Sequence, residues 1–177
     1  MALDKSQIIP FPLPEHLCMF ISEQLDTPIE LIANNVKAKA LHIKNNRPFS
    51  KMILQCLETS NKPVKVKEGI TFYIAVSKNI RRRNKKVVDC RSGFVNFSEK
   101  EIKDITDVFE SLFRLSLVSY VDGAHFGNDF KKGKRYKAIT EFLQKYNLAS
   151  DDKAFQNYEK LFEREKKRSN KLVSKYL

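Results

Sequence analysis

The apolar residues of this chain repeat with two different spacings, and the change of spacing divides the sequence near residue 97. Before it, segments such as 70–77 (ITFYIAVS) place apolar side chains at alternate positions, which is typical of β-strands. After it, apolar residues recur every three or four positions, as they do along one face of a helix. We therefore expect an α+β protein, with a domain of short strands and helices over residues 1–97 and a helical domain over residues 98–177.

The first domain combines strand signals with two short helix signals. Pro14 and Pro48 suit the first turns of helices over residues 15–25 and from residue 48 onward. Strand-like segments are predicted over residues 27–33, 36–43, 63–67, 70–77 and 86–91.

The second domain is expected to contain three helices. Ser98 and Glu101 have the spacing of a capping box, and the helix that follows should stop by Gly123. The segment 122–134 holds three of the five glycines and is predicted to be a boundary or hinge. A shorter helix over 134–148 precedes a turn at 147–150, and the last helix is expected over 151–176.

The positive charge of the chain is concentrated in two places. The chain has 33 Lys and Arg against 21 Asp and Glu, a formal net charge of +12. Residues 78–91 hold seven basic residues and one acid, and residues 131–177 hold fourteen basic residues against six acids. Local excesses of this kind favour an anionic partner such as nucleic acid over a role in solubility alone.

The first excess lies between two predicted strands, in the segment 79–86 (NIRRRNKK). A strand, a polar connection and a second strand predict a β-hairpin whose tip contacts phosphates. The cations of this tip are Arg81, Arg82, Arg83, Lys85 and Lys86. A solvated basic loop is the alternative interpretation.

The last helix separates its charges from its apolar side. On a helical wheel Phe155, Tyr158 and Phe162 share one sector, and no acid falls among the cations opposite them. Those cations are Lys153, Lys160, Arg164, Lys167, Arg168, Lys171 and Lys175. Four more predicted phosphate contacts lie just before the helix over 134–148 and at its start: Lys131, Lys132, Lys134 and Arg135. A face of this kind suits a polyanion, which releases counterions on binding.

The segment KAITEFLQKYNLASDDKAFQNYEKLFERE resembles the helix-turn-helix of DNA-binding proteins, and the small basic chain is similar in style to accessory proteins of phages and mobile elements. The resemblance implies that Lys153, Gln156, Asn157 and Lys160 face the major groove. The sequence departs from that family at the turn, where Asn147 and Leu148 stand in place of the usual Gly.

One cluster could support chemistry. Asp122, His125, Asn128 and Asp129 lie within eight residues, and two carboxylates with an imidazole could bind a divalent metal or transfer protons. The same residues are also common at helix ends and turns. A metal-dependent enzyme at Asp122, His125 and Asp129 is therefore kept as an alternative, and no cofactor is expected.

The predicted function is non-catalytic binding of nucleic acid, with double-stranded DNA favoured. The rival from another class is a phage or mobile-element structural or interaction protein that docks on an acidic partner, and a homodimer or protein partner fits either. No apolar run approaches the ~18 residues of a membrane span. The three cysteines, Cys18, Cys56 and Cys90, are widely spaced, which fits a reducing interior and predicts a cytoplasmic protein. The predicted function adds an association with the nucleoid or a virion. No membrane partner is expected.

Overall fold

The chain forms two compact units, residues 1–107 and 108–177, which are described separately. The structure is a computed structural model, and it describes residues 6–24, 29–33, 36–43, 47–62, 72–77, 93–127, 133–148 and 152–169. The statements below concern those residues.

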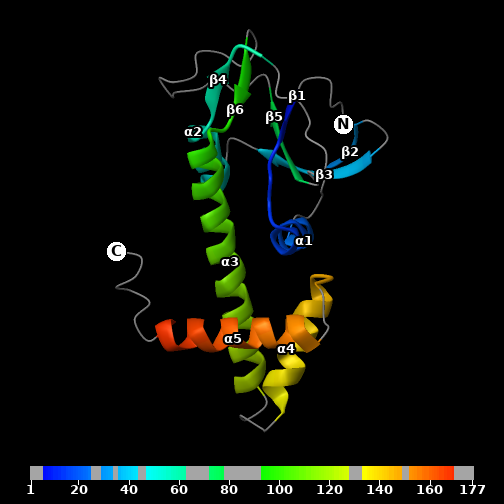
Figure 1. Ribbon diagram of the computed structural model, residues 1–177, viewed down its shortest axis with the longest axis vertical. Helices are drawn as coiled ribbons and strands as arrows, with labels where there is room; N and C mark the ends of the chain where they lie inside the picture. The colour runs from blue at the N-terminus through cyan, green and yellow to red at the C-terminus, as the bar shows by residue number, and fades with distance from the viewer. Residues whose placement is uncertain are drawn as a thin grey trace. The chain divides into compact units, whose positions relative to one another are not determined.

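Unit 1 is built on a four-stranded sheet with a second, two-stranded sheet beside it (Figure 1). The larger sheet has the order β1 (Ser6–Pro10), β5 (Phe72–Ser77), β3 (Val36–Ile43), β2 (Ile29–Ala33), and the smaller one pairs β4 (Glu58–Ser60) with β6 (Phe94–Asn96). The β1–β5, β2–β3 and β4–β6 pairs are antiparallel, whereas β3 and β5 run parallel. Two helices, α1 (Glu15–Gln24) and α2 (Pro48–Gln55), complete this unit before α3 begins.

The inner strand β5 is buried on both faces and paired along both edges. The side chains of residues 72 to 76 are all at most 4% exposed. The side chains that alternate along this strand therefore point to two faces that are both buried. Both edges of β5 are occupied along its length, by β1 and by β3. The expected hairpin between this strand and residues 86–91 stays a prediction, because its second strand is not among the described residues. Residues 78–92, with the predicted basic tip, lie outside the described residues.

A glutamine side chain joins the two sheets of unit 1. Gln7 Nε2 donates to the Val95 carbonyl at 2.9 Å, and the Val95 N–H donates to Gln7 Oε1 at 3.1 Å. The amide thus makes the two bonds that a neighbouring strand would make. Next to it, the rings of Phe11 and Phe97 pack edge to face with centroids 5.4 Å apart.

The long helix α3 (Glu99–Phe126) belongs to both units, since the boundary between them falls after Asp107. Its start matches the sequence expectation, because Ser98 Oγ accepts a hydrogen bond from the Glu101 N–H at 3.3 Å. Its end does not. The helix continues past Gly123, whose carbonyl accepts the Gly127 N–H at 3.0 Å in the ordinary helical pattern. A glycine terminates a helix only where the backbone turns left-handed, and here the helical hydrogen bonding continues through it.

Unit 2 packs the end of α3 against α4 (Lys134–Lys145) and α5 (Asp152–Ser169). The buried side of α3 repeats every four residues, at Phe109, Phe113, Leu117 and Val121. Phe142 of α4 and Tyr158 of α5 both make edge contacts with Phe113 at about 6 Å between ring centroids (5.8 and 6.0 Å). The three helices therefore share one aromatic core.

The turn after α4 uses an asparagine where a glycine is more usual. Asn147 has φ of +51°, and its N–H donates to the Gln144 carbonyl while the Leu148 N–H donates to Leu143 at 2.9 Å. These two bonds form a Schellman motif, and Leu148 and Leu143 are both buried, as that motif favours. Asn tolerates the left-handed conformation better than other non-glycine residues.

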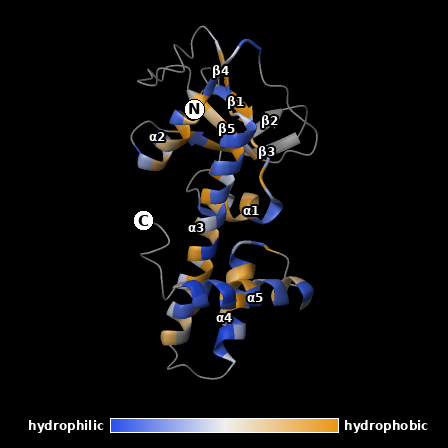
Figure 2. Cartoon of the chain, turned by 60° about the vertical axis from the view of Figure 1, so that its left-hand side comes forward, coloured by the Kyte–Doolittle hydropathy of each residue, from blue (hydrophilic) through white to orange (hydrophobic). Residues whose placement is uncertain are grey.

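The prediction of a mixed α+β fold is confirmed, with short strands in the first half of the chain and helices in the second. Figure 2 shows the hydropathy of these elements, with apolar and polar turns alternating along α3 and α5. Among the described residues, no helix has the length and apolar character needed to cross a bilayer.

Candidate nucleic-acid interface

Helix α5 has a buried side and a polar outer side. Phe155 and Phe162 are buried at 8% and 0% exposure, and Tyr158 and Leu161 are half-buried. The opposite side carries exposed residues only, and we call it the outer face of α5: Lys153, Gln156, Asn157, Lys160, Arg164, Lys167 and Arg168. The separation of cations from apolar residues read from the sequence is thus present in the folded unit.

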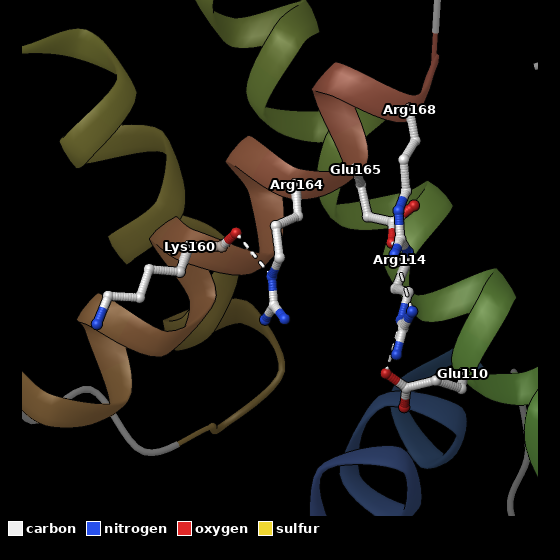
Figure 3. A network of polar contacts seen from close by, with 6 residues as sticks. All are labelled: Glu110, Arg114, Lys160, Arg164, Glu165 and Arg168. Atoms are coloured by element: carbon white, nitrogen blue, oxygen red, sulfur yellow. Dashed lines mark hydrogen bonds and ion pairs between the residues drawn. The ribbon is translucent and has the colours of Figure 1, made fainter. Parts of the chain in front are cut away.

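One acidic residue of α5, Glu165, turns inward to meet Arg114 of α3. Arg114 Nε donates to Glu110 Oε1 at 2.9 Å on its own helix, and Arg114 Nη1 lies 3.4 Å from Glu165 Oε1 (Figure 3). Partial burial works against the charge of Arg114, but the hydrogen bond to Glu110 and the carboxylates of both acids raise its pKa above the ordinary value. Glu165 also accepts Arg168 Nη1 at 3.1 Å.

Two further ion pairs hold α5 against its neighbours. Lys166 Nζ lies 2.7 Å from Asp122 Oδ1 of α3, and Arg135 of α4 pairs with Glu163. The Arg135 guanidinium and the Lys166 ammonium also lie 5.4 and 5.5 Å from the centroid of the Phe162 ring. With Phe162 fully buried, these contacts fix which side of α5 faces solvent.

Most cations of the outer face are not paired with the described acids. Within the described residues, Lys153, Lys160, Arg164 and Lys167 make no ion pair with an acid. Arg164 Nε instead donates to the Lys160 carbonyl at 3.3 Å, and Figure 3 shows both residues apart from the cluster around Arg114, with the Lys160 side chain pointing away from it. One edge is less positive, because Glu159 and Glu163 line a surface hollow together with Lys160 and Arg164.

No protein-family model, no curated protein and no solved structure matches this chain. The similarity to helix-turn-helix proteins therefore depends on α4, the Asn147 turn and α5 alone.

Two predicted phosphate contacts are occupied within the unit. Arg135 of α4 is held by Glu163 of α5, and Arg168 is held by Glu165 three residues earlier on the same helix. Lys134 lies half-exposed at the start of α4. The remaining predicted contacts, Arg81, Arg82, Arg83, Lys85, Lys86, Lys131, Lys132 and Lys171, lie outside the described residues.

The alternative metal site is only partly described. Asp122 pairs with Lys166, and an ammonium at 2.7 Å competes with any cation for that carboxylate. Asp129 and the side chain of His125 lie outside the described residues. In the part of the chain that is described, no group of three His, Cys, Asp or Glu side chains could hold a metal ion.

The ion-pair network was only partly visible in the sequence. The i,i+4 spacing of Glu110 and Arg114 is the signal for the first pair. Arg114 and Glu165 are 51 residues apart, and Asp122 and Lys166 are 44 apart, so no local pattern reveals them.

Proposed function

We propose that this chain is a non-catalytic nucleic-acid-binding protein whose ligand is double-stranded DNA. The phosphate backbone lies along the outer face of α5, and the 81–86 segment supplies further phosphate contacts. The observation that carries the proposal is the exposed row of Lys153, Lys160, Arg164 and Lys167, none of which is ion-paired with a described acid.

The dimensions of this row suit a phosphate backbone. Lys153 and Lys167 are fourteen residues apart, which is about 21 Å along a helix. That length corresponds to roughly six phosphates of one strand at about 3.4 Å each. Glu165 is largely buried and held by Arg114, so it lowers the positive charge of the outer face less than an exposed acid would, whereas Glu163 lies beside Lys160 and Arg164 and lowers it along one edge.

Gln156 and Asn157 add groups that can contact bases. Both are exposed in the first two turns of α5, between Lys153 and Lys160. Their side-chain amides carry both a donor and an acceptor, the combination that pairs with adenine in the major groove. Any preference for sequence is expected from these two residues, and affinity from the cations.

An electrophoretic mobility shift with a salt titration tests the proposal. For the wild-type chain, the logarithm of the association constant should fall steeply and linearly with the logarithm of salt concentration. The triple variant Lys160→Ala, Arg164→Ala, Lys167→Ala should bind more weakly, with a slope smaller by roughly 2 to 3.

A matched control removes the same charge elsewhere. Lys51, Lys100 and Lys103 are exposed residues of unit 1, and their triple Ala variant loses the same three charges. It should retain most of the affinity and the slope. Equal weakening by both triples would show that net charge, and not the outer face of α5, governs binding.

The 81–86 segment is tested in the same assay. Replacing Arg81, Arg82 and Arg83 with Ala should weaken binding on all duplex sequences about equally, because phosphate contacts carry no sequence information. An unchanged affinity would remove this segment from the interface.

The alternatives give different results. A protein that docks on an acidic partner should show no duplex binding at physiological salt, where non-specific attraction to phosphates is weak. Hydrolysis of nucleic acid that requires a divalent metal and disappears in His125→Ala would instead support the enzyme.

A further inference from the structure

Glu159 differs from the other described glutamates of α5 in making no ion pair with a described cation. Glu163 is paired with Arg135 of α4. Glu165 is paired with Arg114 of α3. A carboxylate left without a cation in a chain of net charge +12 is unexpected, since opposite charges attract and this helix is rich in lysine and arginine.

The carboxylate of Glu159 can be reached from outside the protein. Glu159 is half-buried and lines the open surface hollow, about 500 Å³ in volume, together with Lys160, Glu163 and Arg164. Because Lys160 and Arg164 also belong to the outer face of α5, a ligand that contacts both residues borders the hollow and its carboxylates.

Two rows of side chains run side by side along α5. At 100° per residue, three lysines of the outer face fall within a sector of about 40°. We call them the cation row: Lys153, Lys160 and Lys167. Three residues with side-chain oxygens fall within a sector of about 60° that begins about 20° away. We call them the acceptor edge: Gln156, Glu159 and Glu163. A ligand that fits both rows carries negative charge along one line and hydrogen-bond donors along the line beside it.

The major groove of DNA offers both kinds of group. The phosphates of one strand are negatively charged, and the base edges beside them carry donors and acceptors. A carboxylate only accepts hydrogen bonds, so phosphates and base acceptors repel it and an exocyclic amino group attracts it. The usual partner of a glutamate in this groove is the N4 amino group of cytosine.

We propose that Glu159 accepts a hydrogen bond from the N4 amino group of a cytosine while the cation row contacts the phosphates of one strand. This inference rests on the proposed function and adds a specificity-determining residue to it. Gln156 lies three residues earlier, about 4.5 Å along the helix axis, and successive base pairs are about 3.4 Å apart. Gln156 and Glu159 therefore contact adjacent base pairs, and the preferred site contains an A·T pair next to a C·G pair.

Glu163 belongs to the same edge but is engaged within unit 2. Its carboxylate is held by Arg135, which balances its charge and occupies one of its oxygens. Removing it should raise the affinity for all sequences by a similar factor, because a negative charge near the phosphates is lost and Arg135 is released. Glu163 is thus a matched control for Glu159, with the same side chain on the same edge one helical turn away.

Selection from a randomised duplex pool, followed by mobility shifts, tests the inference. The wild-type chain should enrich sites that contain a C·G pair next to an A·T pair. On such a site, replacing the C·G pair with T·A should weaken binding by about 5- to 100-fold. Glu159→Ala should lose most of this preference, mainly by binding the T·A duplex more tightly, since thymine O4 no longer meets a carboxylate. Glu163→Ala should keep the preference.

The outcomes distinguish this inference from the proposed function. If the wild-type chain binds no duplex, the proposed function fails and the inference fails with it. If it binds duplex but enriches no C·G pair, or if Glu159→Ala keeps the full preference for that pair, the inference is wrong and the proposed function is unaffected. A preference lost equally in Glu159→Ala and Glu163→Ala would also overturn the inference, because it would show a general effect of charge.

Discussion

Lys166 Nζ lies 2.7 Å from Asp122 Oδ1 and connects the second half of α5 to the end of α3. Asp122 is the residue for which the sequence offered two interpretations, a metal ligand or a helix-end residue. In the folded unit it is the acceptor of an ion pair with α5.

The Asp122–Lys166 pair should stabilise unit 2 only slightly. Both side chains are more than a third exposed, and pairs at such positions contribute about 0 to 1 kcal/mol. In a double-mutant cycle with Asp122→Asn and Lys166→Gln, the coupling measured by urea denaturation should fall in this range and shrink in 1 M salt. A coupling that persists in high salt would indicate a desolvated pair.

Gln7→Ala should destabilise unit 1 by about 1–3 kcal/mol. The substitution removes both partners of the Val95 backbone, and Val95 is fully buried, so its N–H and carbonyl lose their hydrogen bonds. Gln144→Ala, at an exposed position of α4, is the control and should change the free energy of unfolding by less than about 0.5 kcal/mol. Equal effects of the two substitutions would show that water replaces the amide at Val95.

The turn between α4 and α5 should accept glycine but not alanine at position 147. Asn147 has φ of +51°, a conformation that glycine adopts without strain. Asn147→Gly should keep the stability of the wild-type chain, while Asn147→Ala should lower it by about 1 kcal/mol. Thermal denaturation of both variants measures the difference, and an Ala variant as stable as the Gly variant would contradict it.

Cys56 should be a poor nucleophile in the folded chain. Burial, its hydrogen bond to Glu101 and the nearby carboxylates of Glu101 and Asp104 raise the pKa of the thiol to about 12 from 9.0. Iodoacetamide labelling resolved by peptide should therefore be slow at pH 9 in the native chain and fast in the unfolded chain. Glu101→Gln should speed the native reaction, since it removes one negative charge.

The same shift predicts how stability depends on pH. The folded pKa lies above the unfolded pKa, so the folded state binds this proton more tightly. The contribution of Cys56 is therefore present below pH 9 and lost as the pH rises toward 12. If Cys56→Ser showed the same loss over this range, another group would be responsible.

The sequence by itself determined the elements that depend on neighbouring residues. The Ser98 cap, the helical spacing of α3 and the polar side of α5 are local properties, because helical geometry fixes which residues share a face. The cations at 153, 160, 164 and 167 were correctly placed opposite Phe155 and Phe162 for this reason.

Only the tertiary structure decided which of these groups find partners inside the protein. The pairing of β5 with both β1 and β3 follows from contacts between distant segments. Arg135 looked equivalent to Lys160 and Lys167 in the sequence, but the packing of α4 against α5 brought Glu163 to it. The helix α3 runs past Gly123, where the sequence predicted its end, and the Gly127 N–H bonds to the Gly123 carbonyl in the helical pattern. Charge on a residue is a local property, whereas its availability depends on which distant side chain lies within about 4 Å.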